Sequence, residues 1–331
     1  MQITLVLPIR IDPDRPVSDL DRFIAIGLLS FHRFLALGLV YEMLVVTPNE
    51  DVAQCQETLS RHCRIPFRVT DEALICPSLA NARGWHKQQI LKLAVAAHVK
   101  TDWYLTLDTD VVCVREVDEA FLFDQGKAIW QQEPAGYHED WWEGSQKMLG
   151  GSQAKIPNDQ PVAGVTPALM HVPSVLGLIS FIGQTYNGKD WAVTLLDSHQ
   201  LGWTEYSLYW VYLLNRNEVE KFYSDSKRIL YAKGYGSIWL ADHLKNFNST
   251  ELDKVFARNA EHGFMVFQSN LELPLALPVR FLRSRLGGSA SPSIEEYYRW
   301  QLHLNRYRIR KICSRITGML KQLVDQKPPT S

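Results

Sequence analysis

The 331-residue chain predicts an α/β fold, with a mixed, largely parallel sheet flanked by helices. Over the first hundred residues, short runs rich in β-branched residues alternate with segments of helical periodicity, which is typical of parallel βαβ units. A second indication is a hydrophobic strand pattern that runs directly into two acids at 103–110. The third is composition, because 46% hydrophobic and 21% charged residues suffice for one large domain or one and a half.

The expected elements follow in order along the chain. Strands are expected at 3–9, 43–47, 66–70 and 103–107, and helices at 19–39, 51–62 and 84–99. In the last of these helices, Ile90, Leu93, Ala94 and Ala97 recur with the spacing of one apolar face. After Val114 the pattern predicts strands at 128–132, 162–171 and 262–268, a loop or short helix at 138–143, and helices from 173 and over 204–214.

Asp108 and Asp110 are the main functional signal. Residues two apart in an extended segment point the same way, and two like charges this close repel unless a positive group lies between them. Mg²⁺ or Mn²⁺ takes one or two carboxylates from a protein and leaves its other positions to water and phosphate oxygens. Ligands of open α/β sheets bind beyond the carboxyl ends of the strands, so we expect a metal–phosphate site here. The alternative is that both acids are turn residues that close the strand.

Charge and cysteine content exclude several classes of protein. A net charge of -1, from 35 basic and 36 acidic residues, argues against a nucleic-acid-binding protein. Five scattered cysteines without a Cys-x-x-Cys pair indicate neither a disulfide framework nor a zinc site. The first residues show no signal-peptide pattern, and His171 and Pro173 interrupt the most apolar window. We therefore expect a soluble, cytoplasmic protein.

Several motifs occur in an order that resembles a known family. They are Pro8 at the first strand, Trp85-His86-Lys87-Gln88-Gln89, Leu107-Asp108-Thr109-Asp110, Ala163-Gly164-Val165-Thr166-Pro167-Ala168, and Trp203-Thr204-Glu205-Tyr206. Together they look like a GT-A-fold glycosyltransferase, and more narrowly like the bacterial group DUF6492, over roughly residues 1–270. The resemblance implies a Rossmann-like catalytic domain at 1–273, with a nucleotide-binding half (1–114) and an acceptor-binding half (115–273). Residues 274–331 would form a linker and a basic helical extension.

The resemblance also implies an activity. The expected enzyme is metal-dependent and transfers a sugar from a nucleotide-diphosphate donor to a glycan, lipid-linked or other hydroxyl acceptor, as in polysaccharide biosynthesis. The family pattern assigns the metal, Mn²⁺ or Mg²⁺, to Asp110, and the sugar or ribose together with a share of the metal to Asp108. A late histidine is the usual third ligand, which points to His262, with His243 as the alternative.

Glu205 resembles the general base that inverting members place at a helix start. An inverting transfer needs such a base near the acceptor hydroxyl. The structural alternative is an acid stabilised by the helix dipole, behind Thr204 as N-cap. Ser207 is not the Glu that would complete a capping box. If configuration is retained instead, Glu205 would bind the acceptor or the sugar.

Further residues are candidates for donor and acceptor contacts. Arg10, Arg83 and Lys87 are expected at the diphosphate, although a solvated Lys87 is the simpler interpretation. Asp12, after the first strand, is expected at the base or ribose. Aromatic rings can stack on sugar faces, which makes Trp141, Trp142 and Trp203 candidates for sugar contacts, but ten tryptophans imply that many are core residues.

The segment from Arg299 to Lys321 carries seven basic residues and no acidic one. An amphipathic cationic helix would contact the inner face of an anionic membrane, and a helix packed on the catalytic domain is the alternative. Two other functions stay open. A nucleotidyltransferase would share the early α/β order, but Pro8-Ile9-Arg10-Ile11-Asp12-Pro13 lacks its Gly-rich phosphate loop. A non-catalytic carbohydrate- or nucleotide-binding module is the third interpretation.

Overall fold

The computed structural model describes residues 1–271, apart from 13–14, 16, 81, 83, 151–154, 241 and 244–247, together with a few residues between 275 and 286. Arg83 and the basic segment from Arg299 to Lys321 lie outside the described residues, so the predictions for them are not tested.

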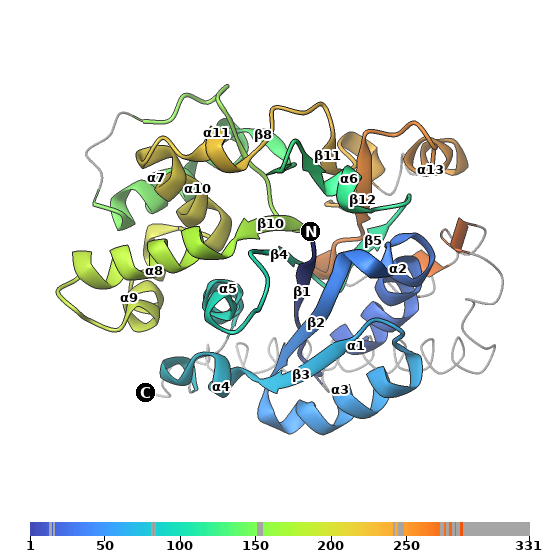
Figure 1. Ribbon diagram of the computed structural model, residues 1–331, viewed down its shortest axis with the longest axis horizontal. Helices are drawn as coiled ribbons and strands as arrows, with labels where there is room; N and C mark the ends of the chain where they lie inside the picture. The colour runs from blue at the N-terminus through green and yellow to red at the C-terminus, as the bar shows by residue number, and fades with distance from the viewer. Residues whose placement is uncertain are drawn as a thin grey trace, which may run out of the picture.

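The main sheet has five strands in the order β10-β4-β1-β2-β3 (Figure 1). Their bounds are Ile3–Pro8 (β1), Val40–Thr47 (β2), Phe67–Asp71 (β3), Trp103–Thr106 (β4) and Ala168–His171 (β10). The first four are parallel, and β10 runs antiparallel to β4. The helices α3 (Asn49–His62) and α5 (Trp85–Ala94) lie in the connections between the parallel strands. The predicted α/β class is confirmed.

The inner strands of this sheet read as nearly continuous apolar runs because both of their faces are covered. All six residues of β1 are buried, and so are the last five of β2. Val6 of β1 pairs with Thr106 of β4, and Pro8 pairs with Val46 of β2. The strand ends at Pro8, Thr47 and Thr106 therefore meet along one edge, and Asp108 follows there.

The helix expected over 19–39 is divided. It consists of α1 (Asp19–Arg22), a π-helical turn (Phe23–Leu28), α2 (Leu29–Phe34) and a 3₁₀ turn (Leu37–Leu39). The π-helical turn packs closely on the backbone just after Asp110, since a Cβ on Gly27 would lie 3.2 Å from the carbonyl oxygen of Val111. A π-turn inside a helix is a local irregularity that apolar periodicity does not show.

The second half of the described chain adds a smaller sheet, two hairpins and a set of helices. The sheet order is β11-β12-β5, with β5 antiparallel and β11 parallel to β12. Its bounds are Ile229–Tyr231 (β11), His262–Val266 (β12) and Val111–Cys113 (β5), and the hairpins are Phe123–Asp124 with Lys127–Ala128 (β6, β7) and Gln132–Pro134 with Pro161–Ala163 (β8, β9). The helices are Glu72–Ile75 (α4), Glu119–Leu122 (α6), Glu139–Met148 (α7), Val172–Thr185 (α8), Trp191–Asp197 (α9), Glu205–Asn215 (α10), Val219–Phe222 (α11) and Ser249–Val255 (α13).

Two expected strands are each split between different partners. In 128–132, Ala128 pairs with Phe123 while Gln132 pairs with Ala163. The run 162–171 likewise divides into β9 and β10, which belong to different sheets. Apolar pattern alone does not specify a strand's partner, so it merged neighbouring short strands into one.

The N-terminus of α10 corrects a second expectation. The hydroxyl of Thr204 accepts a hydrogen bond from the backbone N–H of Ser207 (3.1 Å), and the N–H of Thr204 donates to the Ser207 hydroxyl (2.9 Å). A capping box is therefore present, because the serine oxygen takes the place of the missing carboxylate. This cap fixes the first turn of α10, which carries Glu205 and Tyr206.

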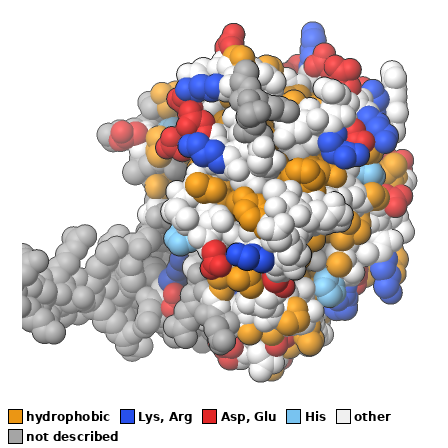
Figure 2. Space-filling view, turned by 90° about the vertical axis from the view of Figure 1, so that its left-hand side faces the viewer, with side chains coloured by type: hydrophobic (Ala, Val, Ile, Leu, Met, Phe, Trp, Pro, Cys, Tyr) orange, Lys and Arg blue, Asp and Glu red, His pale blue; other side chains and the backbone are white. Residues whose placement is uncertain are grey.

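Figure 2 views the side of the molecule that carries α7, α8 and α9, and hydrophobic, charged and neutral polar side chains are interspersed over this face. The exposed large apolar residues of α8 and α9 are Leu176, Phe181 and Val193. Among the described helices, none has the length and hydropathy that crossing a membrane requires.

Candidate active site

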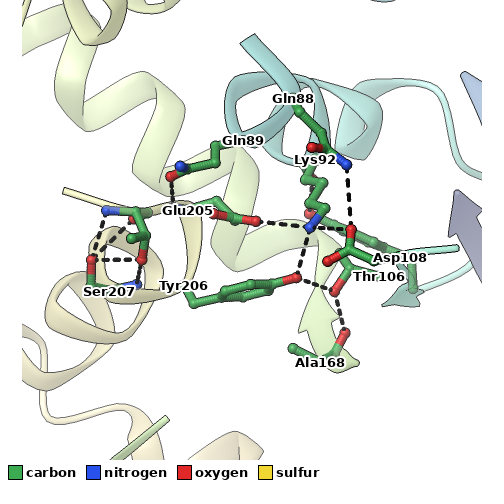
Figure 3. Close-up of polar contacts among 11 residues, drawn as sticks. Gln88, Gln89, Lys92, Thr106, Asp108, Ala168, Glu205, Tyr206 and Ser207 are labelled. Carbon is green, nitrogen blue, oxygen red and sulfur yellow. Dashed lines mark hydrogen bonds and ion pairs between the residues drawn. The ribbon is translucent and has the colours of Figure 1, made fainter. Parts of the chain in front are cut away.

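A buried lysine forms the centre of the site. The ammonium of Lys92, on α5, lies 2.9 Å from Asp108 Oδ1, 3.1 Å from Glu205 Oε1 and 3.2 Å from the Tyr206 hydroxyl (Figure 3). The Lys92 and Glu205 side chains are only 5% and 3% exposed. One cation thus joins α5, the loop after β4 and the first turn of α10.

Further hydrogen bonds hold this cluster in place. Thr106, the last residue of β4, bonds the Tyr206 hydroxyl at 3.0 Å, and the side-chain amide of Gln88 reaches Asp108 Oδ1 at 3.4 Å (Figure 3). The backbone N–H of Glu205 donates to Gln89 Oε1 at 3.2 Å. Lys92, Thr106, Glu205 and Tyr206 are therefore held by helices and a strand, and Asp108 follows directly after β4, as a preorganised site requires.

The charges of the cluster depend on one another. Burial alone would lower the pKa of Lys92, but Asp108, Tyr206 and Glu205 hold it well above its usual value. Burial raises the pKa of Glu205, and Lys92 opposes that rise. The lysine is thus a permanent positive charge, whereas the ionisation of Glu205 depends on it.

Asp110 lies on the other side of the loop and is almost fully buried, at 1% exposure. Its Oδ2 accepts a hydrogen bond from the backbone N–H of Ser269 (2.7 Å), whereas its Oδ1 has no hydrogen-bond partner among the described residues. Burial and the neighbouring Asp108 raise the pKa of Asp110 to about 6, against the opposing effects of Arg22 and Ser269. Arg22 is itself buried, and its Nε and Nη1 also have no hydrogen-bond partner within the described chain.

The acid pair fits a divalent cation. A buried carboxylate oxygen without a hydrogen bond, next to a second carboxylate two residues away, is a donor set suited to Mg²⁺ or Mn²⁺. Among the described residues no group of three His, Cys, Asp or Glu side chains converges on one point. Asp110 and Asp108 would therefore hold the cation with non-protein oxygens completing its coordination.

The structure does not bring His262 to Asp110. Val266 of β12 pairs with Val111, next to Asp110, and His262 lies four residues away at the other end of the strand, about 13 Å along it. Its Nε2 lies 3.0 Å from the carbonyl oxygen of Val255. The structure therefore does not place His262 at the acid pair, because register within the smaller sheet puts it at the other end of β12. The Nδ1 of His243 lies 3.1 Å from the carbonyl oxygen of Ser237, so this ring is also engaged by the backbone.

The remaining charged candidates are distributed along the same sheet edge. Arg10 is exposed directly after β1, and Asp12 lies near Arg15, with 3.9 Å between Asp12 Oδ2 and Arg15 Nε. Lys87 is buried and forms an ion pair with Glu72. The interpretation of Lys87 as a solvated side chain is therefore wrong, and its ammonium already has a carboxylate partner.

The three candidate tryptophans differ in burial. Trp142 and Trp203 are core residues, at 4% and 0% exposure. Trp141 is partly exposed and stacks on His138, with 3.8 Å between ring centroids. Only Trp141 of the three offers a face to a ligand in the described structure.

Sequence reasoning missed Lys92 and Arg22. A lysine inside the apolar run Ile90-Leu91-Lys92-Leu93-Ala94 was the available signal, because a charge on the buried side of a helix needs a partner. Arg22 gave no such signal, because it follows Asp19 and Asp21 in a charged stretch typical of an exposed helical turn.

A family model matches residues 1–285 of the chain. The protein belongs to DUF6492. This family is described as a family of unknown function. Among curated protein sequences, none matches.

The solved structures to which the chain is similar include three glycosyltransferases. The apo structure of the bifunctional glycosyltransferase WbbM has 11% identity and a TM-score of 0.51, over 91% of this chain and 52% of that one. Mouse xyloside xylosyltransferase 1 has 12% identity and a TM-score of 0.49, over 83% of this chain and all of that one. The galactosyltransferase LgtC, solved with donor and acceptor sugar analogues, has 12% identity and a TM-score of 0.43, over 90% and 100%. The similarity to WbbM is one of fold, and the chain has the GT-A-type fold that its sequence predicts.

Proposed function

We propose that this DUF6492 protein is a metal-dependent glycosyltransferase that moves a sugar from a nucleotide-diphosphate donor to a hydroxyl acceptor. The observation that carries the proposal is the pair Asp108 and Asp110 at the carboxyl edge of the sheet, with Asp110 Oδ1 buried and without a hydrogen bond. A buried carboxylate oxygen is costly unless a ligand or cation satisfies it.

Sugar transfer requires a site that stabilises the negative charge of the departing nucleoside diphosphate. Glycosyl transfer passes through an oxocarbenium-like state while negative charge grows on the leaving group. A divalent cation held by Asp110 and Asp108 would stabilise that charge. The ammonium of Lys92, 2.9 Å from Asp108 Oδ1, holds this carboxylate in position.

Glu205 has two candidate roles in this proposal. As the base of an inverting transfer it would accept the acceptor's proton, but its Oε1 is already 3.1 Å from Lys92 and the side chain is nearly inaccessible. We therefore infer that Glu205 principally balances the Lys92 charge. Glu205→Gln separates the roles, because loss of a base abolishes transfer while donor binding persists, whereas a charge-balancing role weakens both.

Thermal unfolding with Mn²⁺ and a set of nucleotide sugars (UDP-glucose, UDP-galactose and GDP-mannose) and free nucleoside diphosphates (UDP and GDP) tests the main proposal. We expect at least one nucleotide to stabilise the protein, by about 2.7 kcal/mol at a concentration one hundred times its Kd. Asp110→Asn should abolish the effect, as should EDTA. The matched control is Asp102→Asn, an exposed acid just before β4 at the opposite end of the strand.

The pH dependence of the stabilisation by Mn²⁺ with nucleotide also tests the role of Asp110. Because the pKa of Asp110 is raised to about 6, protons compete with the cation for it below that pH. Stabilisation by Mn²⁺ with nucleotide should therefore weaken as pH falls from about 7 to about 5. A wild-type response in Asp110→Asn, or one that survives chelation, would contradict the metal role.

A further inference from the structure

The segment that follows β12 holds Asp110 through hydrogen bonds from its backbone. The strands β12 and β5 lie side by side, with Val266 paired to Val111 (Figure 1). The N–H of Phe267 donates to the carbonyl oxygen of Asp110 at 3.0 Å. Two residues later, the N–H of Ser269 donates to Asp110 Oδ2 at 2.7 Å. One short segment therefore fixes both the backbone and the carboxylate of this acid.

The same segment is itself held from its other side. Ile238 forms a parallel bridge with Phe267, and its N–H donates to the carbonyl oxygen of Val266 at 2.7 Å. The N–H of Gln268 donates to the carbonyl oxygen of Ile238 at 2.9 Å. Because Ser269 follows directly after these hydrogen-bonded residues, the direction of its N–H toward the acid is fixed by the smaller sheet.

Asp108 is also held through only one of its two carboxylate oxygens. The ammonium of Lys92 and the side-chain amide of Gln88 both contact Oδ1, at 2.9 Å and 3.4 Å (Figure 3). Neither contact uses Oδ2 of Asp108. In Asp110 the held oxygen is Oδ2, and Oδ1 has no hydrogen-bond partner within the described chain. Each acid thus has one oxygen bound by the protein and another left for a cation.

The number of oxygens left in this way bears on the kind of cation that fits. Mg²⁺ requires a compact octahedral shell and takes one or two carboxylates, with water and phosphate oxygens in the other positions, and Mn²⁺ also suits an octahedral oxygen site. Ca²⁺ takes about six to eight oxygens and often binds a carboxylate through both of its oxygens. Among the described residues, no third His, Cys, Asp or Glu side chain joins the two acids. Binding of Ca²⁺ through both oxygens of Asp110 would require Oδ2, the atom that Ser269 engages.

Ser269 also favours the charged form of Asp110. Burial and Asp108 raise the pKa of Asp110, and Arg22 and hydrogen bonds from both the backbone and the side chain of Ser269 act against that rise. A hydrogen bond donated to a carboxylate stabilises its ionised state, which is the state that binds a cation. The same residue therefore affects both the orientation and the charge of this acid.

We propose that Ser269 is a positioning residue that sets the selectivity of the metal site. By holding Oδ2 of Asp110 it restricts this acid to one oxygen, as Lys92 and Gln88 restrict Asp108, and the site then favours Mg²⁺ or Mn²⁺ over Ca²⁺. This inference rests on the proposed function, because it concerns the cation of the same reaction.

Three substitutions of Ser269 separate its two hydrogen bonds. Ser269→Thr keeps the N–H and the hydroxyl, Ser269→Ala removes the hydroxyl, and Ser269→Pro removes both. Ser269 begins a 3₁₀ turn, and the fixed φ of proline suits the first position of a helical turn. Leu37→Pro is the matched control, because the exposed Leu37 also begins a 3₁₀ turn, after the extended residue Ala36 and at the opposite end of β2 from the site.

Electron paramagnetic resonance of free Mn²⁺ measures the Mn²⁺ affinity of the full-length chain, and displacement of bound Mn²⁺ by added Ca²⁺ measures the selectivity. We expect the wild type to prefer Mn²⁺ by about tenfold or more. Ser269→Pro should weaken Mn²⁺ binding by about 10–100-fold, as loss of a group that orients a metal ligand typically does, and Ca²⁺ binding by less, so that the preference falls. Ser269→Ala should weaken Mn²⁺ binding by about threefold, for one lost hydrogen bond. Ser269→Thr and Leu37→Pro should keep the wild-type affinities.

Several results would overturn the role of Ser269. They are wild-type Mn²⁺ affinity in Ser269→Ala or Ser269→Pro, an equal loss of Mn²⁺ and Ca²⁺ binding in these variants, a similar loss in Leu37→Pro, or a wild type that does not prefer Mn²⁺. The alanine variant keeps the backbone donor, so it decides the matter even if the proline variant does not fold. No Mn²⁺ binding by the wild type would overturn the proposed function as well, whereas wild-type Mn²⁺ binding that is insensitive to position 269 would overturn this inference alone.

Discussion

Replacing Lys92 by methionine tests how the site holds its charges. Methionine preserves most of the side-chain volume and removes the ammonium that lies within 3.1 Å of both Asp108 and Glu205. Glu205 is then a buried carboxylate without a cation, whereas Asp108, whose side chain is 28% exposed, remains partly solvated. Removing one partner of a buried ion pair costs about 3–5 kcal/mol, and we expect a loss of unfolding free energy in this range.

The loss should depend on pH. Burial raises the pKa of Glu205 even beside Lys92, and without the lysine it rises further. A group whose pKa is higher in the folded than in the unfolded state favours the folded state at low pH and loses that contribution as pH rises. The wild-type lysine stays charged over this window, because its pKa is raised. The deficit of Lys92→Met should therefore grow from about pH 5 to about pH 8.

The pH-dependent loss of unfolding free energy is measured by urea unfolding at several pH values. The proteins compared are the wild type, Lys92→Met, Glu205→Gln and the double variant. Neutralising Glu205 in the methionine background should recover about 2 kcal/mol or more, because no buried charge is then left unpaired. Lys147→Met is the control, since Lys147 is exposed and lies 3.8 Å from Glu143, and it should cost under about 0.5 kcal/mol. A deficit that is the same at all pH values, or a double variant no more stable than Lys92→Met, would refute the reasoning.

Two further substitutions test placements that the fold determines. His262→Ala should lower the free energy of unfolding in urea by about 1 kcal/mol, because the hydrogen bond to Val255 is lost. The variant should keep the wild-type Mn²⁺ response. A tenfold weaker Mn²⁺ affinity would instead show that His262 is a metal ligand. Gly144→Ala should cost about 3 kcal/mol or more in thermal unfolding, because the new Cβ would lie 2.1 Å from the carbonyl oxygen of Leu201, and an unchanged melting temperature would mean that α7 does not approach Leu201 so closely.

The sequence by itself was sufficient for the α/β class and for the position of the acid pair. Buried parallel strands are continuous apolar runs, and the helices between them show their own period, so both patterns are local. Asp108 and Asp110 follow such a run directly, which places them at the carboxyl edge before any contact is known. Thr204 as the cap of α10 is equally local, although the serine that completes the box was not expected.

Only the tertiary structure decided which distant residues meet that acid pair. Lys92 and Glu205 are 113 positions apart in the printed numbering, and their contact depends on how α10 packs against α5. His262 was expected at the metal, but the strand register of the smaller sheet places it away from Asp110. The backbone N–H of Ser269 donates a hydrogen bond to Asp110 instead. Sheet register and helix packing are set by the whole core. A local motif therefore identifies the two acids, but it does not identify Lys92, the buried cation that balances their charge.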